Sequence, residues 1–173
     1  VSQTLAIKNT GGSNLSYTIP FFNPIPVADS CSPVISAKNN CCIMGIYNVT
    51  FNAINNTTLE SDGRYLDYSD TINTTVLPNK SYSLSVKTGA SYAEYVRVWI
   101  DYNNNGIFES SEQVFSDQNV LPNLFHTATI TIPSSAVHNT ALRMRVASDY
   151  NFSAVPSPCS NADYGQTEDY NVF

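Results

Sequence analysis

The residues with the clearest capacity for chemistry lie in one twelve-residue run, 101–112. Side-chain oxygens stand at positions 1, 3, 5, 9 and 12 of the run, position 6 is glycine, and position 7 offers a backbone carbonyl. This is the spacing of an EF-hand loop, in which short oxygen-bearing side chains converge on one Ca²⁺ ion. The sequence therefore predicts a calcium site with the ligands Asp101, Asn103, Asn105, Ile107, Glu109 and Glu112.

The segments on either side of this run differ from those of an EF-hand. Residues 96–100 and 112–115 read as strands, so we expect the loop to close a hairpin rather than join two helices, which excludes a calmodulin-like sensor. With Asn at positions 3 and 5, we expect a structural site with a Kd on the order of 0.1–1 mM. The alternative is an Asn-Gly hairpin turn whose carboxylates are solvated and bind no metal.

Other acidic residues support two interpretations. Strand alternation turns Glu168 inward, and a buried carboxylate needs a partner. We expect a structural ion pair between Glu168 and Arg143 or Arg145. The alternative is a second calcium or ligand site built from acids that are distant in sequence, namely Asp67, Asp70, Asp149, Glu168 and Asp169.

Residues with the spacing of known catalytic sites are scarce. His126 and His138 are isolated, and neither a His-Glu-x-x-His stretch nor a Gly-x-Ser-x-Gly elbow occurs. A carboxylate pair for glycoside cleavage is a minor alternative, because spacing along the chain does not reveal separation in space. We interpret the chain as not being an enzyme.

The cysteines favour an oxidising, extracellular setting over a zinc site, because they lack paired CxxC spacing. We leave their connectivity open. Cys41 and Cys42 would point to opposite sides of an extended chain, so at most one of them is expected to bond to a distant partner such as Cys31 or Cys159. The alternative is that some of the cysteines are free and buried. Cys31 and Cys159 are the candidate disulfide pair.

Composition narrows the choice of partners. The formal net charge is −6, and the eight Lys and Arg residues form no basic stripe, which argues against nucleic acid and anionic membranes. No apolar run approaches the roughly 20 residues that a membrane-spanning helix needs, so no membrane insertion is expected. With 42% hydrophobic and only 13% charged residues, the chain is typical of a globular domain rich in polar, uncharged side chains.

The elements that must position these residues are strands. Period-two alternation predicts strands at 45–54, 81–87, 95–101, 127–132, 141–147 and 169–173, and only 134–137 suggests a helical turn. We therefore predict an all-β fold, an antiparallel β-sandwich of jelly-roll type. Residues 1–22 read as a strand pair from the tail of a preceding immunoglobulin-like module, and 23–173 as the sandwich domain. Since the chain begins with Val1, we expect a fragment of a longer secreted protein.

Four ordered motifs resemble the GEVED domain family. Trp-Ile-Asp-Tyr-Asn-Asn-Asn-Gly-Ile-Phe at 99–108 is similar to the family's "WIDYNxDGxF", and Leu-Arg-Met-Arg-Val at 142–146 is similar to its "RMRV" strand. Pro-Cys at 158–159 with Tyr-Gly-Gln-Thr-Glu-Asp-Tyr at 164–170 resembles its closing "PC…YGEVEDY". Residues 65–70 fit its "YxDYS". The chain departs from the pattern at Gln166, where the family has Glu, and at Asn105, where it usually has Asp.

The resemblance covers about residues 31–173 and implies a setting more than a reaction. GEVED domains occur in large secreted proteins of Gram-negative bacteria, beside peptidase, immunoglobulin-like or adhesion domains. The resemblance therefore implies a secreted or cell-surface module for adhesion or domain assembly. Its expected partners are neighbouring domains of the parent protein, or an extracellular protein or glycan. The alternative is a carbohydrate-binding module of a secreted peptidase or glycosidase, because sugars stack on exposed aromatic faces and six tyrosines lie in or near predicted turns: Tyr65, Tyr68, Tyr92, Tyr102, Tyr150 and Tyr164.

Overall fold

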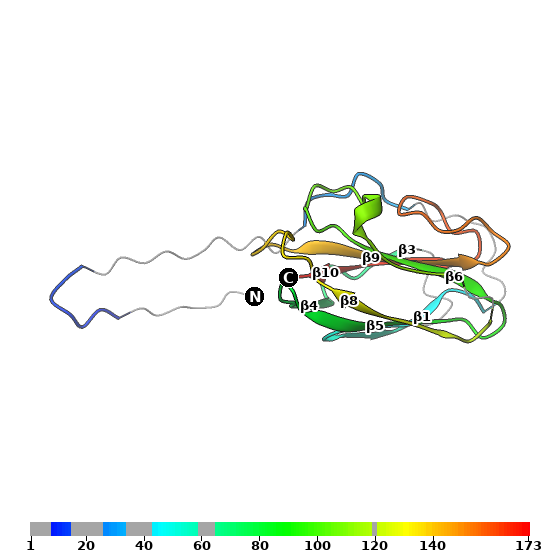
Figure 1. Ribbon diagram of the computed structural model, residues 1–173, viewed down its shortest axis with the longest axis horizontal. Coiled ribbons are helices and arrows are strands. Elements are labelled where there is room, and N and C mark those ends of the chain that lie inside the picture. Colours follow the sequence, from blue (N-terminus) through cyan, green and yellow to red (C-terminus); the bar gives the residue numbers. More distant parts are fainter. Residues whose placement is uncertain (1–7, 15–25, 34–42, 59–64, 119–120) are drawn as a thin grey trace.

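A computed structural model describes residues 8–14, 26–33, 43–58, 65–118 and 121–173 of the chain. The strands form two sheets that stack as layers (Figure 1). This arrangement confirms the predicted all-β sandwich. None of the described segments forms a helix with the length and apolar character that a membrane crossing requires.

The four-stranded sheet has the order β2-β1-β5-β8, and all of its pairs are antiparallel. Its strands are β1 (Ile46–Phe51), β2 (Ile54–Thr57), β5 (Ser81–Thr88) and β8 (Phe125–Thr131). The single strand predicted at 45–54 is wrong, because Asn52 adopts a positive φ of 52° and turns the chain back into the β1–β2 hairpin. Asn tolerates this left-handed conformation better than most residues, and the alternating pattern did not reveal the turn.

The six-stranded sheet has the order β3-β10-β9-β6-β7, with β4 also paired to β10. Its strands are β3 (Tyr65–Asp67), β4 (Asn73–Thr74), β6 (Glu94–Ile100), β7 (Gln113–Asp117), β9 (Leu142–Tyr150) and β10 (Gln166–Val172). β3 and β4 run parallel to β10, so this sheet is mixed at one side. A short 3-10 helix, η2 (Ser110–Glu112), precedes β7.

The hydrophobic core lies between the two sheets. Phe51 and Leu84 from one sheet and Val98, Met144 and Tyr170 from the other are all fully buried. The outer face of the six-stranded sheet is also covered, by the loop before β7, by residues 26–33 and by the chain between β9 and β10 (Figure 1). As a consequence, every residue of β10 is buried. A strand buried on both faces can hold functional polar groups on either side of its sheet.

Candidate functional site

The predicted calcium loop joins β6 to β7. These strands pair antiparallel, with Val98 opposite Phe115 and Trp99 opposite Gln113, which confirms that the loop closes a hairpin. Asp101 directly follows β6 and is only 1% exposed. Its backbone N–H donates to the Arg143 carbonyl at 2.9 Å, so the start of the loop is fixed to β9.

Side-chain oxygens from the first half of the loop turn toward its interior. The two Asp101 carboxylate oxygens accept the backbone N–H groups of Asn105 at 3.1 Å and Gly106 at 2.9 Å. Asn103 Oδ1 accepts the same Asn105 N–H at 3.0 Å, and Asn105 Oδ1 accepts that of Ile107 at 2.7 Å. Because Asp101 and Asn103 accept from the same Asn105 N–H group, one oxygen of each side chain lies close to the other.

The second half of the loop adds two glutamates. Glu112, 4% exposed, accepts backbone N–H groups from Asn103 and Glu109, each at 3.2 Å. Glu109 accepts the side-chain amides of Asn103 at 3.2 Å and Asn105 at 2.7 Å. Burial raises the pKa of Glu112 to about 7. The hydrogen bond between Glu109 and Glu112 lowers the pKa of Glu109 to about 2. No Lys or Arg in the described part of the chain forms an ion pair with these carboxylates or with Asp101.

The donor set of this loop suits a hard cation. It contains carboxylate, amide and carbonyl oxygens without sulfur or imidazole nitrogen, which favours Ca²⁺ over zinc. Each carboxylate oxygen that accepts one N–H group keeps a further lone pair. In the described ranges, no three His, Cys, Asp or Glu side chains meet as a metal cluster by themselves. A calcium ion at this loop would therefore need the Asn103 and Asn105 oxygens and the Ile107 carbonyl as well.

Residues 26–33, which we call the latch, lie across the loop. The Val27 N–H donates to Asn104 Oδ1 at 3.0 Å, and the Ser30 N–H donates to the Gly106 carbonyl at 2.8 Å. Gly106 has a φ of +79°, and a Cβ at this position would lie 2.4 Å from the Ala28 carbonyl oxygen. The glycine of the EF-hand spacing is thus required here for the turn and for the approach of the latch.

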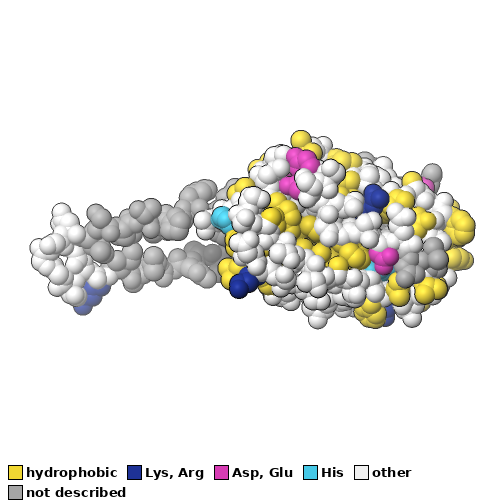
Figure 2. Space-filling model, in the orientation of Figure 1, with side chains coloured by type: hydrophobic (Ala, Val, Ile, Leu, Met, Phe, Trp, Pro, Cys, Tyr) yellow, Lys and Arg dark blue, Asp and Glu magenta, His cyan; other side chains and the backbone are white. Residues whose placement is uncertain are grey.

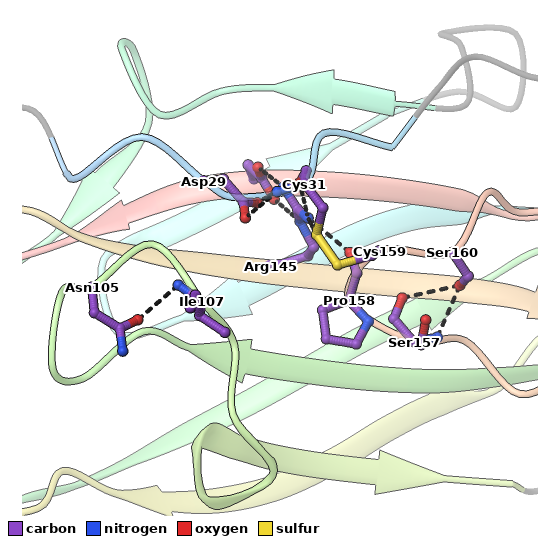
Figure 3. Close-up of a disulfide and its surroundings, with 10 residues drawn as sticks. Asp29, Cys31, Asn105, Ile107, Arg145, Ser157, Pro158, Cys159 and Ser160 are labelled. Atoms are coloured by element: carbon purple, nitrogen blue, oxygen red, sulfur yellow. Dashed lines mark hydrogen bonds and ion pairs between the residues drawn. A yellow bond between two sulfur atoms is a disulfide. The ribbon is translucent and has the colours of Figure 1, made fainter.

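A disulfide ties the latch to the chain between β9 and β10. Cys31 and Cys159 are joined with a Cα–Cα distance of 5.4 Å and are 128 residues apart in sequence (Figure 3). This is the candidate pair of the sequence analysis. Cys41 and Cys42 lie outside the described residues. The disulfide closes a covalent ring that contains β1 to β9, whereas β10 follows the ring in sequence.

Arg145 on β9 lies beneath this disulfide and is fully buried (Figure 3). Its Nε and Nη2 donate to the two oxygens of Asp169, each at 2.7 Å, and Nη2 forms an ion pair with Asp29 at 2.5 Å. Nη1 donates to the carbonyls of Cys31 at 3.0 Å and Pro158 at 2.7 Å. One guanidinium therefore joins the sheet, the latch and the chain between β9 and β10.

Two aromatic rings enclose the same guanidinium. The ring centroids of Phe108 and Tyr65 lie 5.1 and 5.7 Å from Arg145 Cζ, within the range of cation–π contacts. Phe108 belongs to the candidate calcium loop, so the loop and the Arg145 network are in direct contact. Tyr65 also donates its hydroxyl to Asp169 at 2.8 Å, and Arg143 donates to the same carboxylate at 2.9 Å.

The predicted ion pair between Glu168 and Arg143 or Arg145 is wrong, because the acid that binds these arginines is Asp169. Arg145 stands opposite Asp169 in the β9–β10 register, so it shares the outer face with Asp169, whereas Glu168 faces the core. Both Arg143 and Arg145 bind Asp169. Glu168 instead accepts hydrogen bonds from the Tyr170 hydroxyl at 2.5 Å and Thr58 Oγ1 at 3.2 Å.

The structure places the residues of the second acidic group in different surroundings. Asp67 and Asp169 come together on Arg143, which lies 3.4 Å from Asp67. Asp149 instead accepts the backbone N–H groups of residues 163–165. Glu168 is on the opposite face of the sheet from Asp169, and Asp70 is exposed.

Two functional groups were missed by sequence reasoning. Asp29, half of the Arg145 ion-pair system, lies in a proline-rich segment without periodicity. Glu94 is fully buried at the start of β6 and accepts the N–H groups of Gly45 at 3.0 Å and Gly89 at 3.1 Å. Burial raises the pKa of Glu94 to about 7. The only feature of the sequence that indicated its burial was the period-two alternation that places Glu94 on the same strand face as Val96 and Val98.

One comparison with known proteins identifies part of this arrangement. Residues 95–173 match the family model described as the GEVED domain. No curated protein matches the chain significantly. The matched residues include the candidate calcium loop, Arg145, Cys159 and Asp169, whereas the latch and Cys31 precede them.

Proposed function

Residues 95–173 carry a GEVED domain, and from this premise we propose that the chain is a calcium-stabilised, non-catalytic module that fixes neighbouring segments of a secreted or cell-surface protein. GEVED domains are accessory modules of extracellular type. The Cys31–Cys159 disulfide fits this setting, because disulfides persist in oxidising compartments. Adhesion or domain assembly in a Gram-negative surface protein is the biological role that we propose.

The observation that carries this proposal is the Arg145 network. The motif residues Arg145 and Asp169, together with Cys159, are used to hold the latch on the sheet. Both charged side chains are fully buried and form their ion pair within the protein. Buried and mutually paired groups of this kind position a chain segment, whereas catalytic groups must reach a substrate.

Calcium would strengthen the same contact. In our proposal Asp101, Asn103, Asn105, Glu109 and Glu112 supply side-chain oxygens, and the ion neutralises carboxylates that have no Lys or Arg partner among the described residues. The latch rests on Asn104 and Gly106 of this loop. A loop held in one conformation would present these two acceptors in fixed positions, so calcium and the disulfide would fix the latch from its two ends.

Hydrogen exchange of the latch amides tests this role. We expect the N–H groups of Val27 and Ser30 to be protected with calcium, and to lose protection in EGTA and in Arg145→Met. The matched control is Arg97→Met, because Arg97 on β6 donates to the Pro156 carbonyl and forms no hydrogen bond or ion pair with residues 26–33. Equal exchange of the Val27 and Ser30 amides in wild type, EGTA and Arg145→Met would contradict the proposal.

A further inference from the structure

Four aromatic rings form a cluster where β9 ends. Tyr150 lies at its centre, with ring centroids 5.6 Å from Tyr92, 5.2 Å from Phe152 and 5.8 Å from Tyr164. Tyr92, Phe152 and Tyr164 are 44%, 82% and 36% exposed. These four residues, which we call the aromatic platform, present adjacent rings to solvent instead of packing them into the core.

The backbone that carries the platform is held in place. Asp149 accepts the N–H groups of Asp163, Tyr164 and Gly165 at 2.9, 3.0 and 3.1 Å. The Asn151 N–H donates to the Ala93 carbonyl at 3.1 Å, which joins the loop after β9 to the loop that carries Tyr92. The rings are therefore positioned before any ligand arrives, and such preorganisation lowers the entropy cost of binding.

The platform lies far from the C-terminal residue. Val172 pairs with Leu142 at the first residue of β9, and Tyr150 is the last residue of that strand. Eight strand steps of about 3.3 Å separate the two positions by roughly 26 Å. Figure 2 shows hydrophobic side chains gathered at the end of the sandwich that lies away from the C-terminus of Figure 1.

The chemistry of the platform suits a sugar. An aromatic ring has a negative face, which attracts the partly positive C–H groups on the flat side of a pyranose. The tyrosine hydroxyls, Asn151 and Ser153 lie on or directly beside the platform residues in sequence and provide groups that can hydrogen-bond sugar hydroxyls. We propose that the aromatic platform binds a neutral oligosaccharide.

The exposed area favours such a ligand over a protein. Two further apolar side chains, Leu121 and Phe125, are 57% and 55% exposed, and the Lys87 ammonium already covers the Phe125 ring at 5.0 Å. Even with both included, the exposed area is roughly 400–700 Å², taking about 150–250 Å² per large side chain. A stable protein interface uses about 800 Å² per partner, whereas a short oligosaccharide needs only a few rings.

A glycan array with the whole chain in calcium-containing buffer tests the proposal. The follow-up is affinity electrophoresis in gels that contain mannan, laminarin, xylan or galactan. We expect one class of neutral glycan to be retained, and at least tenfold weaker retention for Phe152→Ala and Tyr164→Ala. Because both side chains are exposed, the two variants should have the melting temperature of wild type. Phe125→Ala is the matched control, an exposed aromatic outside the platform that should bind normally.

Three outcomes would overturn the proposal. The first is that no neutral glycan is retained, including the case in which platform variants lose a protein ligand instead. The second is wild-type glycan binding by the folded Phe152→Ala and Tyr164→Ala variants, and the third is an equal loss in Phe125→Ala. None of these outcomes bears on the proposed latch role. Hydrogen exchange at Val27 and Ser30 reports on their bonds to Asn104 and Gly106, which involve no residue of the aromatic platform.

Discussion

The Cys31–Cys159 disulfide provides the most quantitative prediction. We consider the double variant Cys31→Ser/Cys159→Ser, which removes the bridge without a reducing agent and leaves Cys41 and Cys42 unchanged. The bridged residues are 128 positions apart, so the crosslink restrains most of the unfolded chain. Its loss should therefore stabilise the unfolded state and destabilise the folded protein.

The magnitude follows from loop entropy. A closed loop of this length corresponds to about 5 kcal/mol at 25 °C in the chain-entropy treatment of disulfides. For a protein of 150–250 residues, 1 kcal/mol shifts the melting temperature by about 2–4 °C. We therefore expect the double variant to melt about 10–20 °C below wild type. Arg145 Nη1 donates to the Cys31 carbonyl at 3.0 Å and lies farther, at 3.8 Å, from Cys31 Sγ, so most of the Arg145 network is kept and the variant should still fold.

Thermal and urea unfolding monitored by circular dichroism measures this difference. Ser157→Ala/Ser160→Ala is the control, because these residues lie near Cys159 and, within the described part of the chain, the Ser160 hydroxyl bonds with the Ser157 backbone N–H and carbonyl. The control should melt within a few degrees of wild type. A double cysteine variant that unfolds with the wild-type midpoint would refute the argument that this bridge restrains the unfolded chain.

Three further predictions concern buried polar groups. Arg145→Met leaves Asp169 without its main buried partner and should lower the unfolding free energy by about 3–5 kcal/mol in urea, more than Arg97→Met; an equal loss in both would contradict the network's role. Gly106→Ala combines a positive φ with a clash at the latch and should cost at least about 1–2 kcal/mol while exposing the latch to protease; unchanged proteolysis would show that the latch tolerates the added methyl. Glu94 has a folded pKa of about 7, above its ordinary 4.5, so the folded state binds its proton more tightly and stability should fall as pH rises from about 4.5 to 7. Glu94→Gln should flatten this slope in urea titrations across that range, and an unchanged slope would assign it to other groups.

The features that depend on residues close together in the sequence could be predicted from it. The candidate loop was found because all of its oxygen donors lie within residues 101–112, and its hairpin followed from the alternating strands on both sides. The inward orientation of Glu168 also followed from alternation, and the residue is indeed fully buried.

Long-range contacts are what the sequence did not reveal. The bond from Val27 to Asn104 spans 77 residues, and the one from Arg145 to Cys31 spans 114. Alternation assumes that one face of an antiparallel sheet is solvated, but β10 is buried on both faces by segments without periodicity. For this reason the sequence analysis assigned the arginines to Glu168, whereas in the structure both Arg143 and Arg145 pair with Asp169.

The central claim is that calcium holds the loop at 101–112, and a thermal melt in 10 mM Ca²⁺ against EGTA tests it most directly. With a Kd of about 0.1–1 mM, this concentration stabilises the folded state by about 1.4–2.7 kcal/mol, or roughly 3–10 °C. Asp101→Ala should lower the baseline in EGTA, because Asp101 also accepts backbone hydrogen bonds, so the calcium-induced increment is the informative quantity. We predict that this increment disappears in Asp101→Ala and persists in the exposed control Asp70→Asn; identical wild-type melts in calcium and in EGTA would contradict the account.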